Sequence, residues 1–461
     1  MNAQSRAYGG CSPCGRGLQE RTHAMKRWQS MVSMTAAVIV GTTLVSCTSE
    51  GQPNPVADSS SAKPTVDLAA LDTGSYPTEP RPEFGVADDK DWNHFVRVEG
   101  QRMAQFTVLP VEVDPGLVDA ALQLTTPIAS GANLDGLIYD GASKIAANNE
   151  LVSGFSTKAA SDDDPKNMRS LQIMVLRYFT PETAQAAAGQ LTDGFAEFAR
   201  QKGADPVVGT LSGVNGAQTV ATSLPESNGG GDYLHTFTPH GVYVIFTWAS
   251  APSAQQAEAM TRKAIPLQEK LIDQFPRTLT AKERRARGLD PKNLEFPVED
   301  QNKILIYALP HSDEDLNSSD PTAGGKVFIN HALRAVYGPR GLAHFTTDSE
   351  NTFTILKNAG STANAVERSF VYRAETDEKA QELADAYAKS DGDPVAIAPP
   401  PGLTEDQAHC TSIPGVSSTY YQCIVRVGRY VADVHSNNKG DVYQQASAQY
   451  LILTKADQNA N

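Results

Sequence analysis

The cysteines carry the most definite chemistry in this sequence, and Cys47 is the most informative of them. Lys26 and Arg27 form a short positive segment, and a mostly apolar run without charges follows over residues 31–45. Ser46 and Cys47 end that run, ahead of a stretch rich in Pro, Ser and Asn. This order is typical of an export signal, and the run is too short to span a bilayer comfortably. A cysteine at this place predicts a lipobox, in which the thiol is acylated.

Two other interpretations of the leader stay open: a secretory signal with a coincidental cysteine, and an uncleaved anchor helix. A cleaved secretory signal usually ends in an Ala-x-Ala-like pattern, and none precedes Cys47. Acyl chains contribute about 0.8 kcal/mol per buried methylene, so two or more chains would hold the protein firmly on a membrane. We expect a signal peptide over residues 1–46, with Met25 as an alternative start, and the lipidated Cys47 with a flexible tether over residues 47–64. The mature protein would then lie on the extracytoplasmic face of the cell membrane.

The other four cysteines form two pairs with different expected fates. Cys11 and Cys14 make a CxxC, a spacing found in redox and zinc sites, but they precede the cleavage point and so do not belong to the mature protein. Cys410 and Cys423 remain, and an even pair in an exported protein predicts a disulfide. A turn at residues 414–415 separates two strand-like runs, so a β-hairpin would bring these two cysteines together. The alternative is two free thiols.

No familiar catalytic, phosphate-binding or metal-binding motif occurs in the sequence. Gly-x-Ser-x-Gly, Gly-x-x-x-x-Gly-Lys, Gly-x-Gly-x-x-Gly and His-Glu-x-x-His are all absent. Two Ser-x-x-Lys matches begin at Ser60 and Ser436, in the expected tether and in a predicted turn, where the lysine would not be desolvated. The histidines after the leader are scattered, although His235 and His240 flank a predicted hairpin turn and could approach each other. We therefore predict neither a metal nor a cofactor.

Aromatic side chains are the one positive hint of a binding site. Trp92, Phe95, Trp248, Tyr420 and Tyr421 could line a ligand pocket between sheet and helices. The alternative is that they fill the core, as aromatic residues on strands more often do. We take Trp92, Trp248, Tyr420 and Tyr421 as candidate ligand-binding residues.

Charge and length narrow the class of protein. The chain of 461 residues has a formal net charge of −14, and removing the leader leaves 34 basic and 52 acidic side chains. This balance argues against a nucleic-acid partner, which needs a basic surface, and against direct electrostatic adhesion to anionic lipid. Beyond the leader, no uncharged apolar run is long enough to cross a membrane. The remaining chain is long enough to bury at least two cores.

An internal repeat gives the organisation of this body. Residues 174–188 align without gaps with residues 370–384, and seven of the fifteen positions are identical. In each copy a β-rich run ends at a threonine, Thr180 or Thr376, which is a good helix N-cap. An amphipathic helix follows in both copies. Chance similarity of two ordinary segments is the alternative explanation.

A second pair of matching segments, later in each half, supports the repeat. Gly241 and Gly428 each start the pattern Gly-x-Tyr-Val at a predicted hairpin turn. A closing helix is expected after each hairpin, over residues 254–275 and 441–453. The order strand, helix, hairpin, helix therefore occurs twice.

This order predicts an α+β protein with two tandem, duplicated domains, each a mostly antiparallel sheet packed by helices. We expect the first domain over residues 65–280, a linker with basic residues and prolines over 281–300, and the second domain over 301–461. A further helix is expected ahead of each repeat core, over residues 134–149 and 327–337.

Residues 67–82 read Asp-Leu-Ala-Ala-Leu-Asp-Thr-Gly-Ser-Tyr-Pro-Thr-Glu-Pro-Arg-Pro. This motif resembles the N-terminal part of an actinobacterial family of cell-envelope lipoproteins of unknown function. The family is of the mycobacterial or nocardial type. The hairpin over residues 423–434 is similar to segments of mycobacterial cell-wall lipoproteins and extracellular sensor domains. The resemblance implies that the protein is located at the cell envelope, and it supplies no catalytic residues.

Three functional hypotheses follow. The first is a non-enzymatic, membrane-anchored lipoprotein that binds an envelope lipid, another envelope ligand or a protein partner in a groove between helices and sheet. The second is an envelope hydrolase or transferase whose catalytic residues are dispersed in the sequence. The third is a structural or assembly factor without a small ligand. The missing catalytic motifs favour the first.

Overall fold

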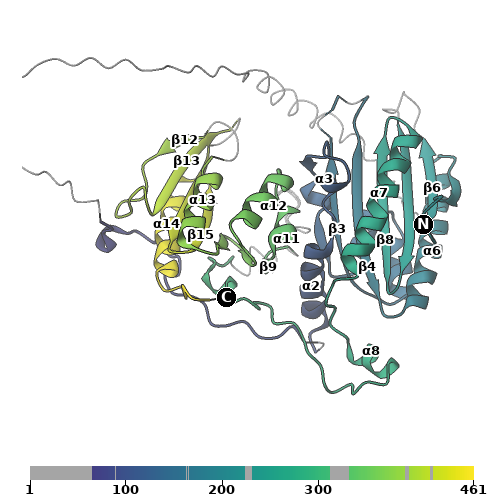
Figure 1. Cartoon of the computed structure of the whole chain (residues 1–461), viewed down its shortest axis with the longest axis horizontal. Coiled ribbons are helices and arrows are strands. Elements are labelled where there is room, and N and C mark those ends of the chain that lie inside the picture. Colours follow the sequence, from purple (N-terminus) through teal and green to yellow (C-terminus); the bar gives the residue numbers. More distant parts are fainter. Residues whose placement is uncertain are drawn as a thin grey trace, which may run out of the picture. The chain divides into compact units, whose positions relative to one another are not determined.

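Two antiparallel sheets with helices packed on them form the part of the chain that the computed structural model describes (Figure 1). These residues belong to one unit, Lys63–Asn461, so the predicted leader and Cys47 lie outside the described residues. None of the described helices is long and apolar enough to cross a membrane. The description covers residues 65–460 except 89, 162, 165, 224–230, 312–331, 390–393 and 416–418.

The first sheet has eight strands in the spatial order β1-β3-β4-β8-β7-β6-β5, with β2 paired to β3. Its strands are β1 (Asp119–Ala120), β2 (Thr126–Ile128), β3 (Leu151–Ala160), β4 (Ser170–Tyr178), β5 (Val207–Thr210), β6 (Gln218–Ser223), β7 (Asp232–His240) and β8 (Tyr243–Ala251). The accompanying helices are α2 (Trp92–Met103), α3 (Pro110–Val113), α4 (Asn133–Leu137), α5 (Ala142–Asn148), α6 (Pro181–Gln201), α7 (Ala254–Ile272) and α8 (Ala281–Ala286).

The second sheet has seven strands in the order β12-β13-β14-β15-β11-β10-β9. Its strands are β9 (Ala335–Tyr337), β10 (Asn364–Val366), β11 (Phe370–Arg373), β12 (Val395–Ile397), β13 (Ala408–Pro414), β14 (Thr419–Val427) and β15 (Tyr430–Ser436). The accompanying helices are α11 (Pro339–Ala343), α12 (Ser349–Asn358), α13 (Asp377–Tyr387) and α14 (Lys439–Leu453).

The two sheets share one topology, which confirms the predicted duplication and the α+β class. Starting from β9, the strand order of the second sheet is β9-β10-β11-β15-β14-β13-β12. Position by position, these strands correspond to β1-β3-β4-β8-β7-β6-β5 of the first sheet. Helix α6 connects β4 to β5 just as α13 connects β11 to β12, and α7 and α14 close the two halves. The predicted caps also hold: Thr180 Oγ1 accepts from the Thr183 backbone N–H and Thr376 Oγ1 from that of Lys379, at 3.2 Å each.

Both faces of the first sheet are buried. Alternate residues of a strand point to opposite faces, so Met174 and Leu176 of β4 pack towards α6, while Leu171 and Ile173 pack towards α7. Figure 1 shows α6 and α7 running along these strands. Since two helical layers cover it, β4 is buried along its whole length.

The second sheet is also covered on both sides, and one of its cores is shared with the first half. Val442, Ala446 and Ile452 of α14 pack on one face. The other core combines Tyr372 and Val431 of the second sheet with residues of the first half, namely Met103, Phe155, Val175, Tyr243, Ile272 and Phe275. His344, just after α11, adds polar contacts: its Nδ1 lies 3.0 Å from Thr157 Oγ1 and its Nε2 3.1 Å from the Ala104 carbonyl oxygen.

The segment ahead of α2 packs on the second half before the chain enters the first. Asp67 N–H donates to the Gly402 carbonyl at 2.9 Å, and the Tyr76 hydroxyl donates to Asp441 Oδ1 at 2.7 Å. Arg81 N–H donates to the Ile306 carbonyl at 2.9 Å. The motif that carries the lipoprotein resemblance is therefore a strap on the second sheet, although it lies far from that sheet in the sequence.

The predictions of a helix ahead of each repeat core are both wrong, for different reasons. Residues 134–149 form α4 and α5 in place of one helix, because the chain turns at Gly141, where φ is 110°, and Asp135 Oδ1 accepts the backbone N–H groups of Gly141 and Ser143. In 327–337, residues 335–337 form β9 and pair with β10, while 327–331 lie outside the described residues. This strand has only three residues, and its pairing with β10, distant in sequence, decides its conformation.

Candidate functional site

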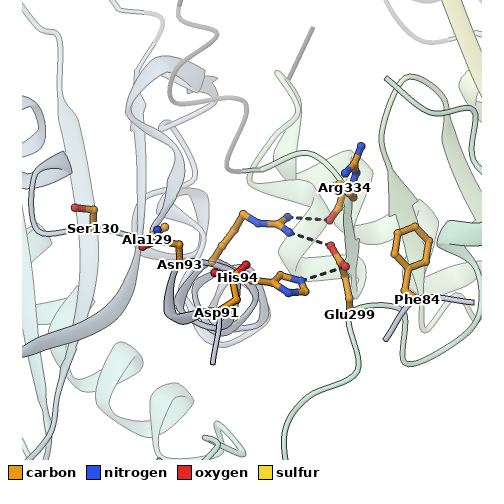
Figure 2. Close-up of a pocket in the computed structure, with 9 residues that line it drawn as sticks. Phe84, Asp91, Asn93, His94, Ala129, Ser130, Glu299 and Arg334 are labelled. Atoms are coloured by element: carbon orange, nitrogen blue, oxygen red, sulfur yellow. Dashed lines mark hydrogen bonds and ion pairs between the residues drawn. The ribbon is translucent and has the colours of Figure 1, made fainter. Parts of the chain in front are cut away.

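The start of α2 borders two adjoining cavities, of about 650 and 470 Å³. We call them together the α2 groove. The larger cavity is lined by Phe84, Asp91, Asn93, His94, Arg97, Ala129, Ser130, Glu299 and Arg334 (Figure 2). The smaller shares Asn93, Ala129 and Ser130 with it and adds Trp92, Gly131, Ala132, Ser143, Lys144, Ala147, Leu151 and Val152.

The close packing of α2 on the first sheet fixes the position of the groove. A side chain at Gly100 of α2 would come within 2.8 Å of the Gly154 carbonyl oxygen on β3, and one at Gly154 within 2.5 Å of the Val175 carbonyl oxygen. Glycine at position 100 therefore lets the helix backbone approach β3, and glycine at position 154 avoids a clash with the neighbouring strand β4. At its N-terminus, Asp91 caps α2 by accepting the His94 backbone N–H at 3.2 Å.

One carboxylate organises the larger cavity. His94 and Arg97 lie three residues apart on α2 and so on the same face of the helix. His94 Nε2 lies 3.1 Å from Glu299 Oε2, and Arg97 Nη2 donates to Glu299 Oε1 at 3.0 Å (Figure 2). Burial raises the pKa of Glu299, but the hydrogen bond from His94 and the positive charge of Arg97 outweigh burial and lower the pKa overall. Glu299 is therefore charged at neutral pH and holds both side chains in place.

A second buried carboxylate holds two further arginines in place next to this cluster. Glu367 is fully buried and pairs with Arg81 and with Arg334, whose Nε lies 3.4 Å from Glu367 Oε1. Arg97 Nη1 donates to the Arg334 carbonyl at 3.4 Å, which links the two carboxylate clusters. Arg334 itself has a φ of 51°, an unusual backbone conformation for a residue with a side chain. The larger cavity therefore lies where α2 meets the residues just before β9.

The smaller cavity offers polar groups that are not already engaged. Asn93 and Lys144 are exposed, and neither side chain has a hydrogen bond or ion pair to any described residue. Trp92 remains 37% exposed, although its ring stacks on Phe179 at a centroid distance of 6.1 Å. An ammonium, an amide and an aromatic ring are groups that recognise a polar ligand.

The arrangement suits binding better than covalent chemistry. His94 is held by a carboxylate, as a general base is, but Figure 2 shows Ser130 at the other side of the cavity from His94 and Glu299. In the part of the chain that is described, no cluster of three or more His, Cys, Asp or Glu could hold a metal ion. The cavity is mainly a fixed polar surface.

The structure does not gather the four aromatic candidates. Trp92 lines the smaller cavity, whereas Trp248 lies on β8 with the Lys158 ammonium 3.7 Å from its ring centroid. Tyr420 and Tyr421 are neighbours on β14, in the other sheet, and therefore point to opposite faces. Their role as ligand-binding residues stays a prediction.

The other candidate residues have clear places. Cys410 and Cys423 are direct partners on β13 and β14 and form the predicted disulfide. His235 and His240 do not meet: His235 is buried against Phe195, with ring centroids 3.8 Å apart, and His240 Nε2 lies 2.7 Å from Asp273 Oδ1.

Sequence reasoning missed most of the α2 groove. His94 was visible only as one of several scattered histidines, and Arg97 and Glu299, 202 residues apart, carry no motif. The spacing of His94 and Arg97 on an amphipathic helix was the only local signal.

Comparison with known proteins places the two halves in one family. Residues 87–286 match "Domain of unknown function (DUF7373) N-terminal" and residues 315–456 match its C-terminal counterpart. A search of curated proteins found no match. Among solved structures, the extracellular domain of PknH from Mycobacterium tuberculosis is similar at 13% identity, covering 43% of this chain and 100% of that one, with a TM-score of 0.27, too low to support an argument. Since its two matched domains span most of the sequence, the chain belongs to the DUF7373 family, whose function is unknown.

Proposed function

We propose that this protein is a lipid-anchored, extracytoplasmic lipoprotein of an actinobacterial cell envelope that binds an envelope ligand without transforming it. Two features support this localisation: the leader pattern that ends at Cys47 and the resemblance over residues 67–82. The α2 groove is the single observation that carries the binding activity. It combines a sizeable cavity with polar side chains held in place by buried carboxylates.

The free groups of the groove indicate an acidic glycan as ligand. Lys144 provides a point charge for a carboxylate or phosphate group. The Asn93 amide can both donate to and accept from hydroxyl groups, and the exposed part of Trp92 offers an apolar surface to a sugar ring. Because the His94 and Arg97 side chains already bind Glu299, little side-chain entropy is lost there when a ligand enters.

Native mass spectrometry tests the proposal first. Residues 48–461, which include every described element, would be exported through an oxidising route and purified gently. We expect a stoichiometric excess mass that is lost when the protein is denatured and that identifies the ligand. A bare polypeptide mass, together with no binding to acidic envelope glycans, would contradict a small ligand and favour a protein partner.

Variants locate the binding site. We expect Lys144→Ala and Asn93→Ala each to weaken glycan binding about tenfold, the effect of losing one hydrogen bond or ion pair to a ligand. Trp92→Ala should also weaken binding. The matched control is Lys166→Ala, which removes an exposed lysine outside the groove. An equal loss in this control would show that the ligand binds elsewhere.

A further inference from the structure

The residues around α8 form a basic cluster on an otherwise acidic protein. Six of the 39 lysines and arginines of the chain lie within the sixteen residues 277–292, namely Arg277, Lys282, Arg284, Arg285, Arg287 and Lys292. The same segment has two acidic residues, Glu283 and Asp290. We call these six side chains the α8 cluster.

The one buried acidic group of this segment is already neutralised. Glu283 has almost no exposed surface and pairs with the buried Arg177, whose Nη2 lies 2.7 Å from Glu283 Oε2. The Arg177 Nη2 also donates to the Thr278 carbonyl at 2.7 Å. These contacts fix the start of α8 against the first sheet and leave the basic side chains on its outer side.

Much of the cluster is exposed and unpaired. Arg285, Arg287 and Lys292 are exposed, and none of them has a side-chain hydrogen bond or ion pair to a described residue. Lys282 pairs with Glu150, and Arg284 Nε donates to the Asp290 carbonyl at 2.7 Å. At least three positive charges therefore face solvent without a partner.

The acidic net charge of the protein does not cancel this local field. The Debye length is about 8 Å at physiological ionic strength, so charges on distant surfaces are largely screened from the cluster. What a partner meets at α8 is the local excess of positive charge. The net charge of the whole chain therefore does not describe the charge at this surface.

Apolar side chains next to the cluster narrow the choice of partner. Leu289 follows Arg287 and Gly288 and is 43% exposed, and Val298, 39% exposed, lines a cavity of about 500 Å³ together with Arg277 and Arg284. Basic residues interspersed with exposed apolar ones are typical of surfaces that lie at a membrane interface. A free polyanion would use the charges and leave Leu289 in water.

We propose that the α8 cluster docks the protein body onto a bilayer bearing anionic phospholipid headgroups. This inference rests on the proposed function only in that acyl chains on Cys47 would keep such a bilayer within reach. Docking would orient the body on the membrane and add to the hold of the anchor. It is separate from ligand binding in the α2 groove, because no residue of the cluster lines that groove.

Vesicle binding of the unlipidated body, residues 48–461, tests this proposal. We expect it to sediment with vesicles of phosphatidylglycerol and phosphatidylcholine and not with phosphatidylcholine alone, and to be released by salt. Each lysine or arginine near an anionic surface contributes about fivefold to partitioning. The triple variant Arg285→Gln, Arg287→Gln, Lys292→Gln should therefore bind about 100-fold more weakly. These exposed side chains make no hydrogen bond or ion pair with a described residue, so the variant should fold.

The matched control neutralises three exposed lysines elsewhere, Lys166→Gln, Lys357→Gln and Lys389→Gln, and changes the net charge equally. It should bind vesicles as the unchanged body does. Equal losses in both triple variants, or no preference for anionic vesicles, would overturn the proposal. Binding to soluble polyphosphate without binding to vesicles would also overturn it. Glycan binding of the triple variant, measured in parallel, reports on the α2 groove alone, so failure of one proposal is distinguishable from failure of the other.

Discussion

Arg177 on β4 lies directly opposite Tyr243 on β8 in the first sheet. Arg373 on β11 lies opposite Tyr430 on β15 in the second, at the corresponding place. Both arginines are buried, at 0% and 2% exposure. The two halves therefore preserve the topology, the strand register and a buried arginine–tyrosine pair. In the first half that arginine binds two buried carboxylates, Glu99 and Glu283, and thereby fixes α2 and α8 to the sheet.

The first prediction concerns that buried network. Arg177→Met should lower the free energy of unfolding by about 3–5 kcal/mol, because it leaves the buried Glu283 without its ion-pair partner and the buried Glu99 with only the partly exposed Arg102. Arg169→Met is the control: Arg169 also pairs with two carboxylates, those of Asp114 and Asp163, but it is partly exposed and should cost less than about 1 kcal/mol. Urea unfolding measures both values. Similar losses would show that burial of the network is not what matters.

The second prediction is a loss of stability in mild acid. Burial lowers the pKa of His344 and of His235 to about 3, whereas an unfolded histidine titrates near 6.5. Between these values the unfolded chain binds protons that the folded chain does not. The free energy of unfolding should therefore be fully present above pH 6.5 and fall as the pH drops towards 3, by about 1.4 kcal/mol per pH unit for each histidine.

Urea unfolding at several pH values between 7 and 5 measures this slope. His235→Phe keeps a ring beside Phe195 and removes one titrating group, so the slope should decrease by about half. An unchanged slope in this variant would contradict burial of neutral His235.

The third prediction concerns the disulfide between Cys410 and Cys423, which are thirteen residues apart. Replacing both by alanine should lower the free energy of unfolding by about 3 kcal/mol, since the unfolded chain regains the entropy of that loop. Treatment of the unchanged protein with a reductant should give a similar shift. A reductant effect that persists in the double variant would point away from this disulfide. Glycan binding should remain, because neither cysteine lines the α2 groove.

The fourth prediction compares the same glycine substitution at corresponding positions in the two halves. Gly241 and Gly428 occupy the same hairpin turn with φ of 56° and 54°. Alanine at either position should cost about 1–2 kcal/mol from the left-handed conformation alone. The added methyl group at Gly241 would meet no atom within 4 Å, whereas at Gly428 it would displace the Gln458 side chain, whose Oε1 accepts the Arg429 backbone N–H at 3.1 Å. Gly428→Ala should therefore be the more destabilising in thermal or urea unfolding, and the reverse order would contradict the packing at this turn.

The repeated core could be predicted because its signals are local. A threonine cap, a helical stripe and a glycine turn each act over a few residues, and the same set occurs twice. These signals predict both hairpins and the helices α6, α7, α13 and α14, with bounds close to those in the structure. The break between α4 and α5 was missed because Asp135 accepts backbone groups several residues ahead, which helical periodicity does not reveal.

The sequence by itself determined the duplicated α+β organisation, the caps and the cysteine pair. Tertiary structure decided the strap over residues 66–84, the short strand β9 and the α2 groove, in which only Trp92 had been a candidate. The physical reason is distance along the chain. The folded structure brings Arg97 to Glu299 and Arg81 to Glu367, and neither pair has a spacing that secondary structure imposes.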